Sequence, residues 1–194
     1  SETLPAMLGA LAIVGFVLAY LLRSLLRTTS ALEVGRAEAE FRANHDPLTG
    51  LANRAHFNQQ LEEALSAPGG GGTSVALLAL DLDRFKQVND TLGHEAGDEL
   101  LRQVSGRIKA LLDDNDTLAR LGGDEFVIVQ SAIKTVNESS RLSEKIISRV
   151  SEPYKLAGTD VRIGVSIGVA LARDSARDGL DLPARADFAL YQAK

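Results

Sequence analysis

A glycine pair between two apolar runs predicts a tight β-hairpin in the middle of the chain. The runs cover residues 117–121 and 126–129, and Gly122 and Gly123 follow the first of them. Glycine reaches positive φ without steric cost, and the tightest hairpin turns require positive φ. Two strands joined in this way have to be neighbours in an antiparallel sheet.

The tip of this hairpin carries more charge than a turn needs. Asp124 and Glu125 follow the glycines directly, and Arg120 lies just before them. Backbone without side chains lets a ligand approach closely, and paired carboxylates bind hard cations such as Mg²⁺. These residues alone fit an acidic, solvated turn equally well.

A second acidic site is expected at the end of a buried strand. Residues 75–80 form a nearly continuous apolar run that leads into Asp81, with Lys86 shortly after. If this strand and the hairpin are neighbours, Asp81, Asp124 and Glu125 converge, and such a cluster repels itself without divalent cations. Lys86 and the hairpin arginine would then supply the positive charge that phosphoryl transfer needs.

The order of the other elements predicts an α/β (α+β) sandwich around a mostly antiparallel, five-stranded sheet. Asn53 is a good N-cap for a helix that ends near Pro68. Further helices are expected after Gly93, over residues 136–150 and over residues 183–194, and a strand over residues 161–171.

The N-terminal segment contains a run long enough to cross a membrane. Residues 4–22 carry no charge, and as a helix they would span roughly 28 Å, close to the hydrocarbon thickness of a bilayer. Arginines follow this run, beginning at Arg23, and only Glu2 precedes it. The positive-inside rule places the chain after Arg23 in the cytoplasm. We therefore predict a transmembrane helix within residues 1–24; a signal peptide and a buried core helix are the alternatives.

Residues 25–44 have the composition of a helical linker. Leu25, Leu32 and Ala39 recur every seven residues, as in a parallel coiled coil. The companion heptad positions hold Thr28, Gly35 and Arg42, which suit a coiled-coil seam poorly. A coiled coil and a simple solvated helix both remain open.

Composition narrows the functional classes. The 194 residues suffice for one domain, over residues 45–194, and an appendage. The net charge of −5 argues against broad nucleic-acid binding, and the absence of cysteine excludes disulfides and thiolate metal sites. Because the first residue is Ser1, we expect the sequence to be an excerpt of a longer chain.

The two acidic motifs together resemble a known family. Residues 81–98, with the segment from Arg120 to Phe126, are similar to the GGDEF diguanylate cyclases, and the similarity extends over residues 45–194. It implies a nucleotidyl-cyclase, palm-like fold and the condensation of two GTP into cyclic di-GMP with release of two pyrophosphates. It further implies two Mg²⁺ ions per active site, for which Mn²⁺ could substitute, and a homodimer in which each domain binds one GTP. The alternative is a non-catalytic, GTP-binding regulatory module.

The resemblance also assigns roles to individual residues. The metal ligands would be Asp81, the Leu82 carbonyl, Asp124 and Glu125, and either hairpin acid could deprotonate the attacking hydroxyl. Asn89 and Asp98 match the pair that reads guanine. The remaining substrate contacts would be Phe85, Lys86, Gly122, Gly123 and Lys194, whereas His94 either contacts the ligand or organises its loop.

Two departures from the family pattern affect the expected regulation. Many members carry an Arg-x-x-Asp product-inhibition site before the hairpin, but here its ends are Asp113 and Asp116, so we expect no product inhibition there. The family also continues past Lys194 with a phosphate-binding arginine, so the domain is expected to be truncated. The predicted membrane segment suggests control by an upstream sensor and a location at the bacterial inner (cytoplasmic) membrane, with the catalytic domain in the cytoplasm.

Overall fold

The structure is a computed structural model that describes residues 15, 16, 20, 23, 24, 39, 41–66, 74–172 and 181–194. Contacts divide the chain into two compact units, Ser1–Ala43 and Asn44–Lys194. Most of the predicted membrane segment and linker lies outside the described residues, so both predictions stay untested. Within the described part, no helix combines the length and apolar character that crossing a bilayer requires.

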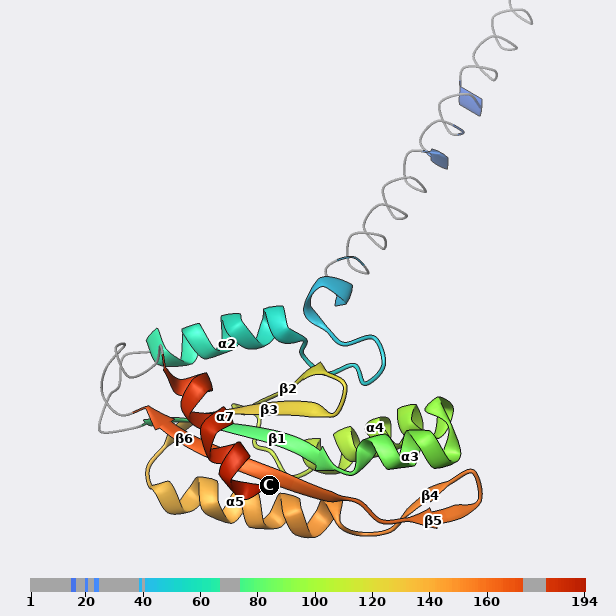
Figure 1. Cartoon of the computed structure of the whole chain (residues 1–194). Coiled ribbons are helices and arrows are strands. Elements are labelled where there is room, and N and C mark those ends of the chain that lie inside the picture. The colour runs from blue at the N-terminus through green and yellow to red at the C-terminus, as the bar shows by residue number, and fades with distance from the viewer. Residues whose placement is uncertain are drawn as a thin grey trace, which may run out of the picture. The chain divides into compact units, whose positions relative to one another are not determined.

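The second unit alternates helices and strands (Figure 1). In chain order the elements are α2 (Arg54–Ser66), β1 (Ser74–Asp83), α3 (Phe85–Leu92), α4 (His94–Lys109), β2 (Thr117–Gly122), β3 (Glu125–Ile133), α5 (Val136–Val150), β4 (Tyr154–Leu156), β5 (Thr159–Val161), β6 (Gly164–Ala172) and α7 (Leu182–Ala193). The predicted hairpin is present as β2 and β3. The helix predicted over residues 136–150 matches α5.

Four of these strands form one antiparallel sheet in the order β2-β3-β1-β6, and β4 and β5 form a separate two-stranded sheet. The mostly antiparallel α/β fold is therefore confirmed, but the predicted five-stranded sheet is wrong. The strand expected over residues 161–171 belongs to two elements, because Val161 ends β5, which pairs with β4, and β6 begins only at Gly164. Ala157 and Gly158 make the turn between β4 and β5 with φ of 48° and 80°, as a tight hairpin requires.

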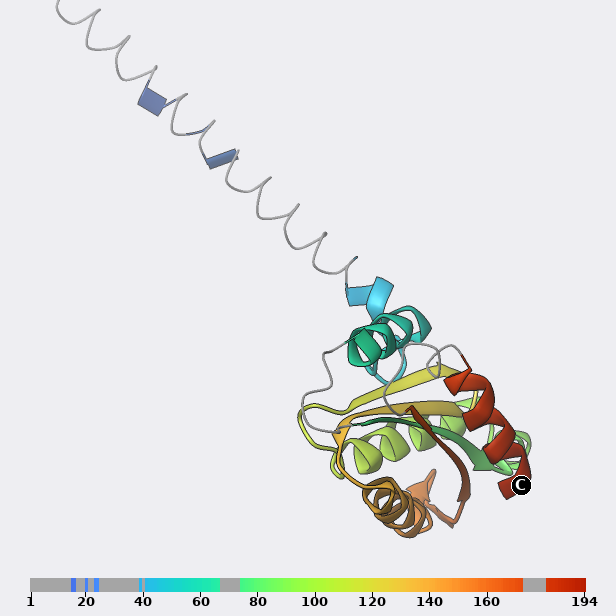
Figure 2. The same cartoon turned by 90° about the vertical axis from the view of Figure 1, so that its left-hand side faces the viewer.

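Strand β1 lies inside the sheet and has helices on both of its faces. Successive side chains of a strand point to opposite faces. Leu78, Leu80 and Leu82 pack in one cluster with residues of α4 and α5, whereas Leu77 and Ala79 pack in another with α2 and α7. Figures 1 and 2 show the two pairs of helices on opposite sides of the sheet.

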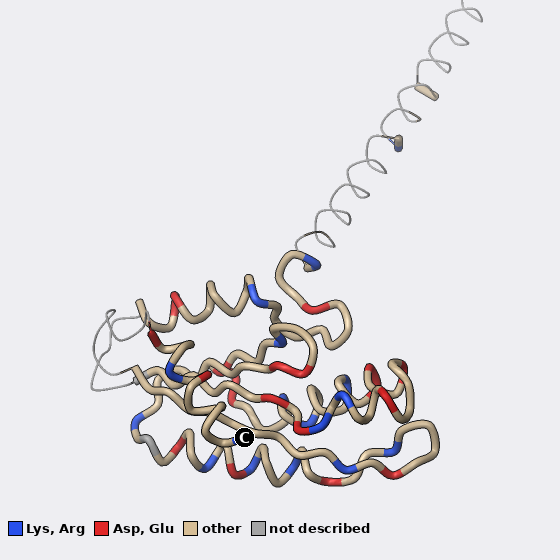
Figure 3. The backbone as a smooth tube through the Cα atoms, in the orientation of Figure 1, with Lys and Arg blue, Asp and Glu red and all other residues tan. Residues whose placement is uncertain are grey.

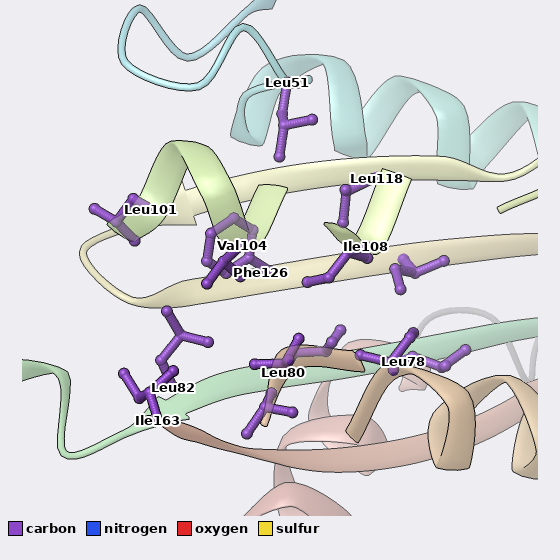
Figure 4. Packing of buried hydrophobic residues seen from close by; sticks show 14 of the residues in the cluster. Leu51, Leu78, Leu80, Leu82, Leu101, Val104, Ile108, Leu118, Phe126 and Ile163 are labelled. Carbon is purple, nitrogen blue, oxygen red and sulfur yellow. The ribbon is translucent and has the colours of Figure 1, made fainter. Parts of the chain in front are cut away.

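The cluster beneath α4 and α5 fixes the end of β1. Figure 4 shows Leu80 and Leu82 of β1 within this cluster, together with Phe126 of β3 and Val104 of α4. Leu80 and Leu82 are each 1% exposed, and full burial of one leucine contributes about 1.5–3 kcal/mol. Asp81 lies between these two buried residues, so its backbone position is tightly held.

Helix α7 packs unusually close to β6. A Cβ atom built on Gly168 of β6 would lie 2.2 Å from the Ala186 carbonyl oxygen and 2.2 Å from the Leu190 nitrogen. Both of these are backbone atoms of α7, so no side-chain rotation could relieve the overlap. Glycine at this position therefore lets α7 lie directly on the sheet.

Candidate active site

The end of β1 and the tip of the hairpin are neighbours in the sheet. Asp81 is paired with Glu125 across β1 and β3, and the Leu82 N–H donates to the Asp124 carbonyl oxygen at 3.4 Å. Acidic residues gather along this end of β1 and at the β2–β3 turn in Figure 3. The two acidic motifs, separate in the sequence, therefore meet at the same end of two neighbouring strands, β1 and β3.

The turn itself leaves room for a ligand. Gly122 and Gly123 have φ of 146° and 54°. A Cβ atom at either glycine would have nothing within 4 Å, so the space beside this backbone is open. Glycine is thus used here for its conformation and for an uncovered backbone surface.

A lysine from α7's end occupies the middle of the acidic region. The ammonium group of Lys194 lies 2.9 Å from Asp81 Oδ1. This hydrogen bond to Asp81 is the main reason that the pKa of Lys194 is raised, and the charges of Asp81, Asp124 and Asp83 add to it against partial burial. The carboxylates of β1 and the hairpin therefore create a negative potential that attracts a cation.

The three acids predicted to form one metal cluster do not all converge. In the part of the chain that the structure describes, no three His, Cys, Asp or Glu side chains lie close enough together to hold a metal ion. Glu125 instead lies 4.0 Å from the guanidinium of Arg54. That ion pair is largely solvent-exposed and hence weak.

The remaining donor set still suits Mg²⁺. This ion usually keeps several waters and binds protein through one or two carboxylates, together with substrate phosphates. Asp81, Asp124 and the Leu82 carbonyl meet that requirement without a third carboxylate. The position taken by the Lys194 ammonium shows that this region favours positive charge.

Strand β1 leads into α3 through one residue with unusual backbone geometry. Arg84 has φ of 63°, the left-handed region that non-glycine residues rarely adopt. It provides no side-chain cap for α3. The first-turn N–H groups of α3 include those of Phe85 and Lys86, and such groups at a helix N-terminus can donate hydrogen bonds to phosphate oxygens. Lys86 is exposed beside them, whereas the Phe85 side chain is buried.

The predicted guanine-reading pair is divided between α3 and α4. Asn89 and Asp98 are both partly buried, and the Asn89 carboxamide lies against Gly97, the neighbour of Asp98 in sequence. His94 is the first residue of α4 and is exposed. The structure thus places the Asn89 carboxamide against the residue that precedes Asp98, and the exposed position of His94 fits both roles considered for it.

A cavity extends from the acidic region between α3 and the segment that joins β5 to β6. Its volume is about 890 Å³, within the range of ligand sites in proteins. Asp81 and Lys194 lie at this cavity, and Gln87 and Thr91 of α3 line it further along. It adjoins the acidic region at Asp81 and Lys194, but neither the hairpin glycines nor Lys86 line it.

Arg120 is directed away from the role predicted for it. Its guanidinium donates to Asp46 Oδ1 at 2.9 Å and to the Gly123 carbonyl oxygen at 2.8 and 3.0 Å. The sequence suggested that this charge would face a transferring phosphoryl group. The contacts instead make Arg120 a positioning residue that ties the hairpin turn to the loop before α2.

Asp46 holds the other end of this connection. Burial alone would raise the pKa of Asp46, but hydrogen bonds from Thr49 and the contact with Arg120 outweigh burial and lower it. The folded state therefore binds the proton less well than the unfolded chain does. The stabilisation is complete above the ordinary aspartate pKa, about 4, and is lost as the pH falls through the lowered value.

Removal of the Arg120 guanidinium should destabilise the unit. The Arg120 and Asp46 side chains are only 11% and 15% exposed, so Arg120→Met leaves a poorly solvated carboxylate without its charge partner, although the hydrogen bonds from Thr49 remain. We expect a loss of about 2–3 kcal/mol in the free energy of unfolding at pH 7. Urea unfolding of Arg120→Met, Asp46→Asn and the double variant measures this loss and the coupling between the two residues.

The difference between wild type and Asp46→Asn should shrink as the pH falls below about 4, because the wild-type carboxylate then takes up its proton. Equal and additive losses at every pH would show that the two side chains act independently.

Sequence reasoning missed Asp46 and Asp83 as contributors to this site. Asp46 could have been found from its place before Pro47, since an Asp-Pro pair favours a turn and Asp side chains often bond to nearby backbone there. Asp83 Oδ1 accepts a hydrogen bond from Ser166 Oγ at 2.8 Å. Asp83 and Ser166 are far apart in sequence, so no local sequence pattern predicts their hydrogen bond.

Known proteins resemble this chain over the same unit. The family model described as "Diguanylate cyclase, GGDEF domain" matches residues 43–194. The chain is 42% identical over 166 residues to the bifunctional diguanylate cyclase/cyclic di-GMP phosphodiesterase MucR of Pseudomonas aeruginosa, covering 84% of this chain and 24% of MucR. It is 38% identical over 164 residues to the diguanylate cyclase TpbB of the same species, covering 84% of this chain and 38% of TpbB. The chain thus spans a minor part of either relative.

Solved structures agree with this assignment. The GGDEF domain of TpbB (YfiN) has a TM-score of 0.73 and 39% identity, covering 77% of this chain and 88% of that one. The coiled coil and GGDEF domain of DgcB from Caulobacter crescentus, solved with c-di-GMP, has a TM-score of 0.75 and 33% identity, covering 88% of this chain and 92% of that one. With its acidic hairpin, the neighbouring buried strand that carries Asp81 and these matches, the chain belongs to the GGDEF family of diguanylate cyclase domains.

Proposed function

We propose that this chain is a diguanylate cyclase that condenses two GTP into cyclic di-GMP and releases two pyrophosphates. The observation that carries the proposal is the meeting of Asp81 with the glycine hairpin at one end of the neighbouring strands β1 and β3, where the Lys194 ammonium contacts Asp81. The names of the relatives MucR and TpbB support the same activity.

The reaction makes two phosphodiester bonds by the same step. The 3′-oxygen of one GTP attacks the α-phosphorus of the other, and the bond from that phosphorus to the β-phosphate bridging oxygen breaks. The proton of the 3′-hydroxyl passes to a carboxylate of the hairpin, Asp124 or Glu125. Bound Mg²⁺, held by Asp81, the Leu82 carbonyl and Asp124, would neutralise charge on the phosphates. Two ions per site, or Mn²⁺ in their place, remain part of the proposal.

The chain's own residues orient the triphosphate. The first-turn amides of α3, at Phe85 and Lys86, would bind phosphate oxygens, and the Lys86 ammonium would offset their charge. Gly122 and Gly123 would let the nucleotide lie against bare backbone. With Asp81 engaged as a metal ligand, the Lys194 ammonium would be available to bind the terminal phosphate.

Specificity for guanine would come from Asn89 and Asp98. A carboxylate can accept hydrogen bonds from both N1–H and the exocyclic amine of guanine. Adenine presents no such pair of donors, so the Asp98 carboxylate would be left unpaired in a complex with ATP. Sites that leave a buried polar group unpaired reject the wrong ligand strongly.

The proposed enzyme works as a homodimer, because one chain with one GTP cannot complete a two-fold symmetric product. The DgcB structure, which includes a coiled coil, supports a helical linker as the element that joins two such domains. Anchoring through residues 4–22 at the bacterial inner membrane, and control by an upstream sensor, belong to the same proposal.

A non-catalytic, GTP-binding regulatory module is the second candidate. Loss of a metal ligand or a hairpin acid would favour it, but Asp81, Asp124 and Glu125 are all present. Incubation of the purified dimer with GTP and Mg²⁺, with products separated by chromatography, distinguishes the two. Cyclic di-GMP and pyrophosphate support the enzyme, whereas GTP binding by a verified dimer without any product supports the regulatory module.

The product should not bind at the segment before the hairpin. Asp113 stands where family members with an inhibitory site carry arginine, and burial together with the Asp113 charge raises the pKa of Asp116. Two acids cannot attract the dianionic product. Isothermal titration with cyclic di-GMP should therefore detect no binding that Asp116→Ala removes.

A variant that restores the arginine of the inhibitory site tests the same prediction by a gain of binding. Asp113→Arg should create a cyclic di-GMP site with inhibition that depends on Asp116, whereas Asp114→Arg, which adds the same charge one residue later, should not. Tight, Asp116-dependent binding to the wild-type protein would contradict this prediction.

A further inference from the structure

Helices α3 and α4 are in contact at Gly97 of α4, a residue without a side chain. A Cβ atom built on Gly97 of α4 would lie 1.8 Å from Asn89 Oδ1 and 2.9 Å from Asn89 Cγ. Real Cβ atoms essentially never approach another heavy atom within 3.0 Å. The carboxamide of Asn89 therefore rests directly on the backbone of α4, in space that only glycine leaves free.

The glycine is not explained by the helix itself. Gly97 lies inside α4, where glycine is less favourable than alanine, and its φ is not among the positive values. Gly106 of the same helix provides the comparison, since a Cβ atom there would meet nothing within 4 Å. The overlap at Gly97 is therefore specific to the contact with α3.

Neighbouring groups also hold the backbone and the ring beside the Asn89 carboxamide. Asn89 is in the last turn but one of α3 and is partly buried, and the ring of Phe85 is 3.3 Å from the same built Cβ atom. The Gly93 N–H donates to the Asn89 backbone carbonyl oxygen at 2.9 Å, and this hydrogen bond restrains the backbone of Asn89. Asp98 follows Gly97 directly and is partly buried.

We propose that Gly97 is a specificity-determining positioning residue, which seats the Asn89 carboxamide beside Asp98 so that the two side chains can bind one guanine edge. This rests on the proposed role of Asn89 and Asp98 in GTP recognition. Gly97 does not touch the nucleotide; it acts by giving the amide a place on α4.

Alanine at position 97 should then disturb binding more than folding. The closest atom is the end of a side chain, which can rotate, so Asn89 would leave its seat while the helices keep their packing. The Phe85 ring would need to move only a few tenths of an ångström. Nucleotide affinity should fall while the reacting groups at Asp81 and the hairpin remain in place.

The experiment is a double-variant cycle on the full chain. Wild type, Gly97→Ala, Asn89→Ala and the double variant are compared by titration with the non-reacting analogue α,β-methylene-GTP and by thermal unfolding. Gly97→Ala should weaken binding about tenfold, with KM for GTP raised and kcat little changed, as expected when uniform binding is lost. Asn89→Ala should weaken binding similarly.

The double variant separates positioning from a general effect. It should bind the nucleotide no more weakly than Asn89→Ala alone, because the carboxamide that Gly97 accommodates is already absent. It should also recover the Tm that Gly97→Ala loses, because the overlapping amide is gone. Gly106→Ala is the matched control and should leave nucleotide affinity unchanged.

Two results would overturn the inference and leave the proposed function intact. The first is that Gly97→Ala binds the nucleotide as tightly as the wild type does while Asn89→Ala binds it weakly. The second is that the losses of affinity of the two single variants add up in the double variant. Wild-type affinity in Asn89→Ala would remove both the inference and the proposed role of Asn89. A Gly97→Ala protein that does not fold, and that Asn89→Ala does not rescue, would also contradict the inference.

Discussion

Asp81→Asn should reduce cyclic di-GMP formation by about a thousandfold or more while the fold survives. Asparagine has the same shape as aspartate, and the adjacent Leu80 and Leu82 hold the backbone in either case. The variant removes the charge that a divalent cation needs at the end of β1, and charge stabilisation of this kind accounts for a large share of phosphoryl-transfer catalysis. Chromatography of the products under saturating GTP and Mg²⁺ measures the loss.

Asp90→Asn is the matched control, since Asp90 lies on α3 as an exposed carboxylate. It should turn over GTP at the wild-type rate. Thermal unfolding of both variants shows whether the fold is kept. Substantial turnover by a folded Asp81→Asn protein would mean that Asp81 does not hold the catalytic metal.

Gly168→Ala should have the largest effect on stability. The added methyl group would overlap two backbone atoms of α7, the Ala186 oxygen and the Leu190 nitrogen, each 2.2 Å away. The whole helix must move, because neither atom can rotate aside. We expect a loss of about 3 kcal/mol or more in the free energy of unfolding, at or beyond the upper end of ordinary overpacking.

Urea unfolding measures this loss, and Gly106→Ala gives its baseline. Position 106 is helical and open, so alanine there should be neutral or stabilise the protein by up to about 1 kcal/mol. Displacement of α7 should also carry Lys194 away from Asp81. A Gly168→Ala protein as stable as the wild type would show that α7 does not lie as closely on β6 as the structure has it.

Local patterns in the sequence predicted those parts of the fold that depend on neighbouring residues. The glycine pair predicted the β2–β3 hairpin, and the spacing of apolar residues predicted α5 between Val136 and Val150. The apolar run before Asp81 predicted β1, although the strand continues to Asp83 because residues beyond Leu80 still pair with β6.

Contacts between distant segments were harder to predict. Arg120 looked like a free cation beside an acidic turn, and only the folded chain brings Asp46 to within 2.9 Å of it. Helix α3 was not predicted because its start depends on Arg84 in a left-handed conformation, which sequence does not favour. The position of Glu125 was also not predictable from local sequence, because its ion pair with Arg54 depends on where α2 lies.

In the proposed function, the site on one chain is half of a catalytic centre, and subunit mixing tests this directly. The measurement mixes wild-type chain with the Asp81→Asn chain at constant total concentration, under conditions in which subunits exchange freely, and follows cyclic di-GMP formation. If both chains of a dimer must supply a working site, activity falls as the square of the wild-type fraction, because only dimers with two intact chains complete both bonds. Activity that falls in direct proportion to the wild-type fraction would show that one chain completes the reaction alone, and would contradict the account.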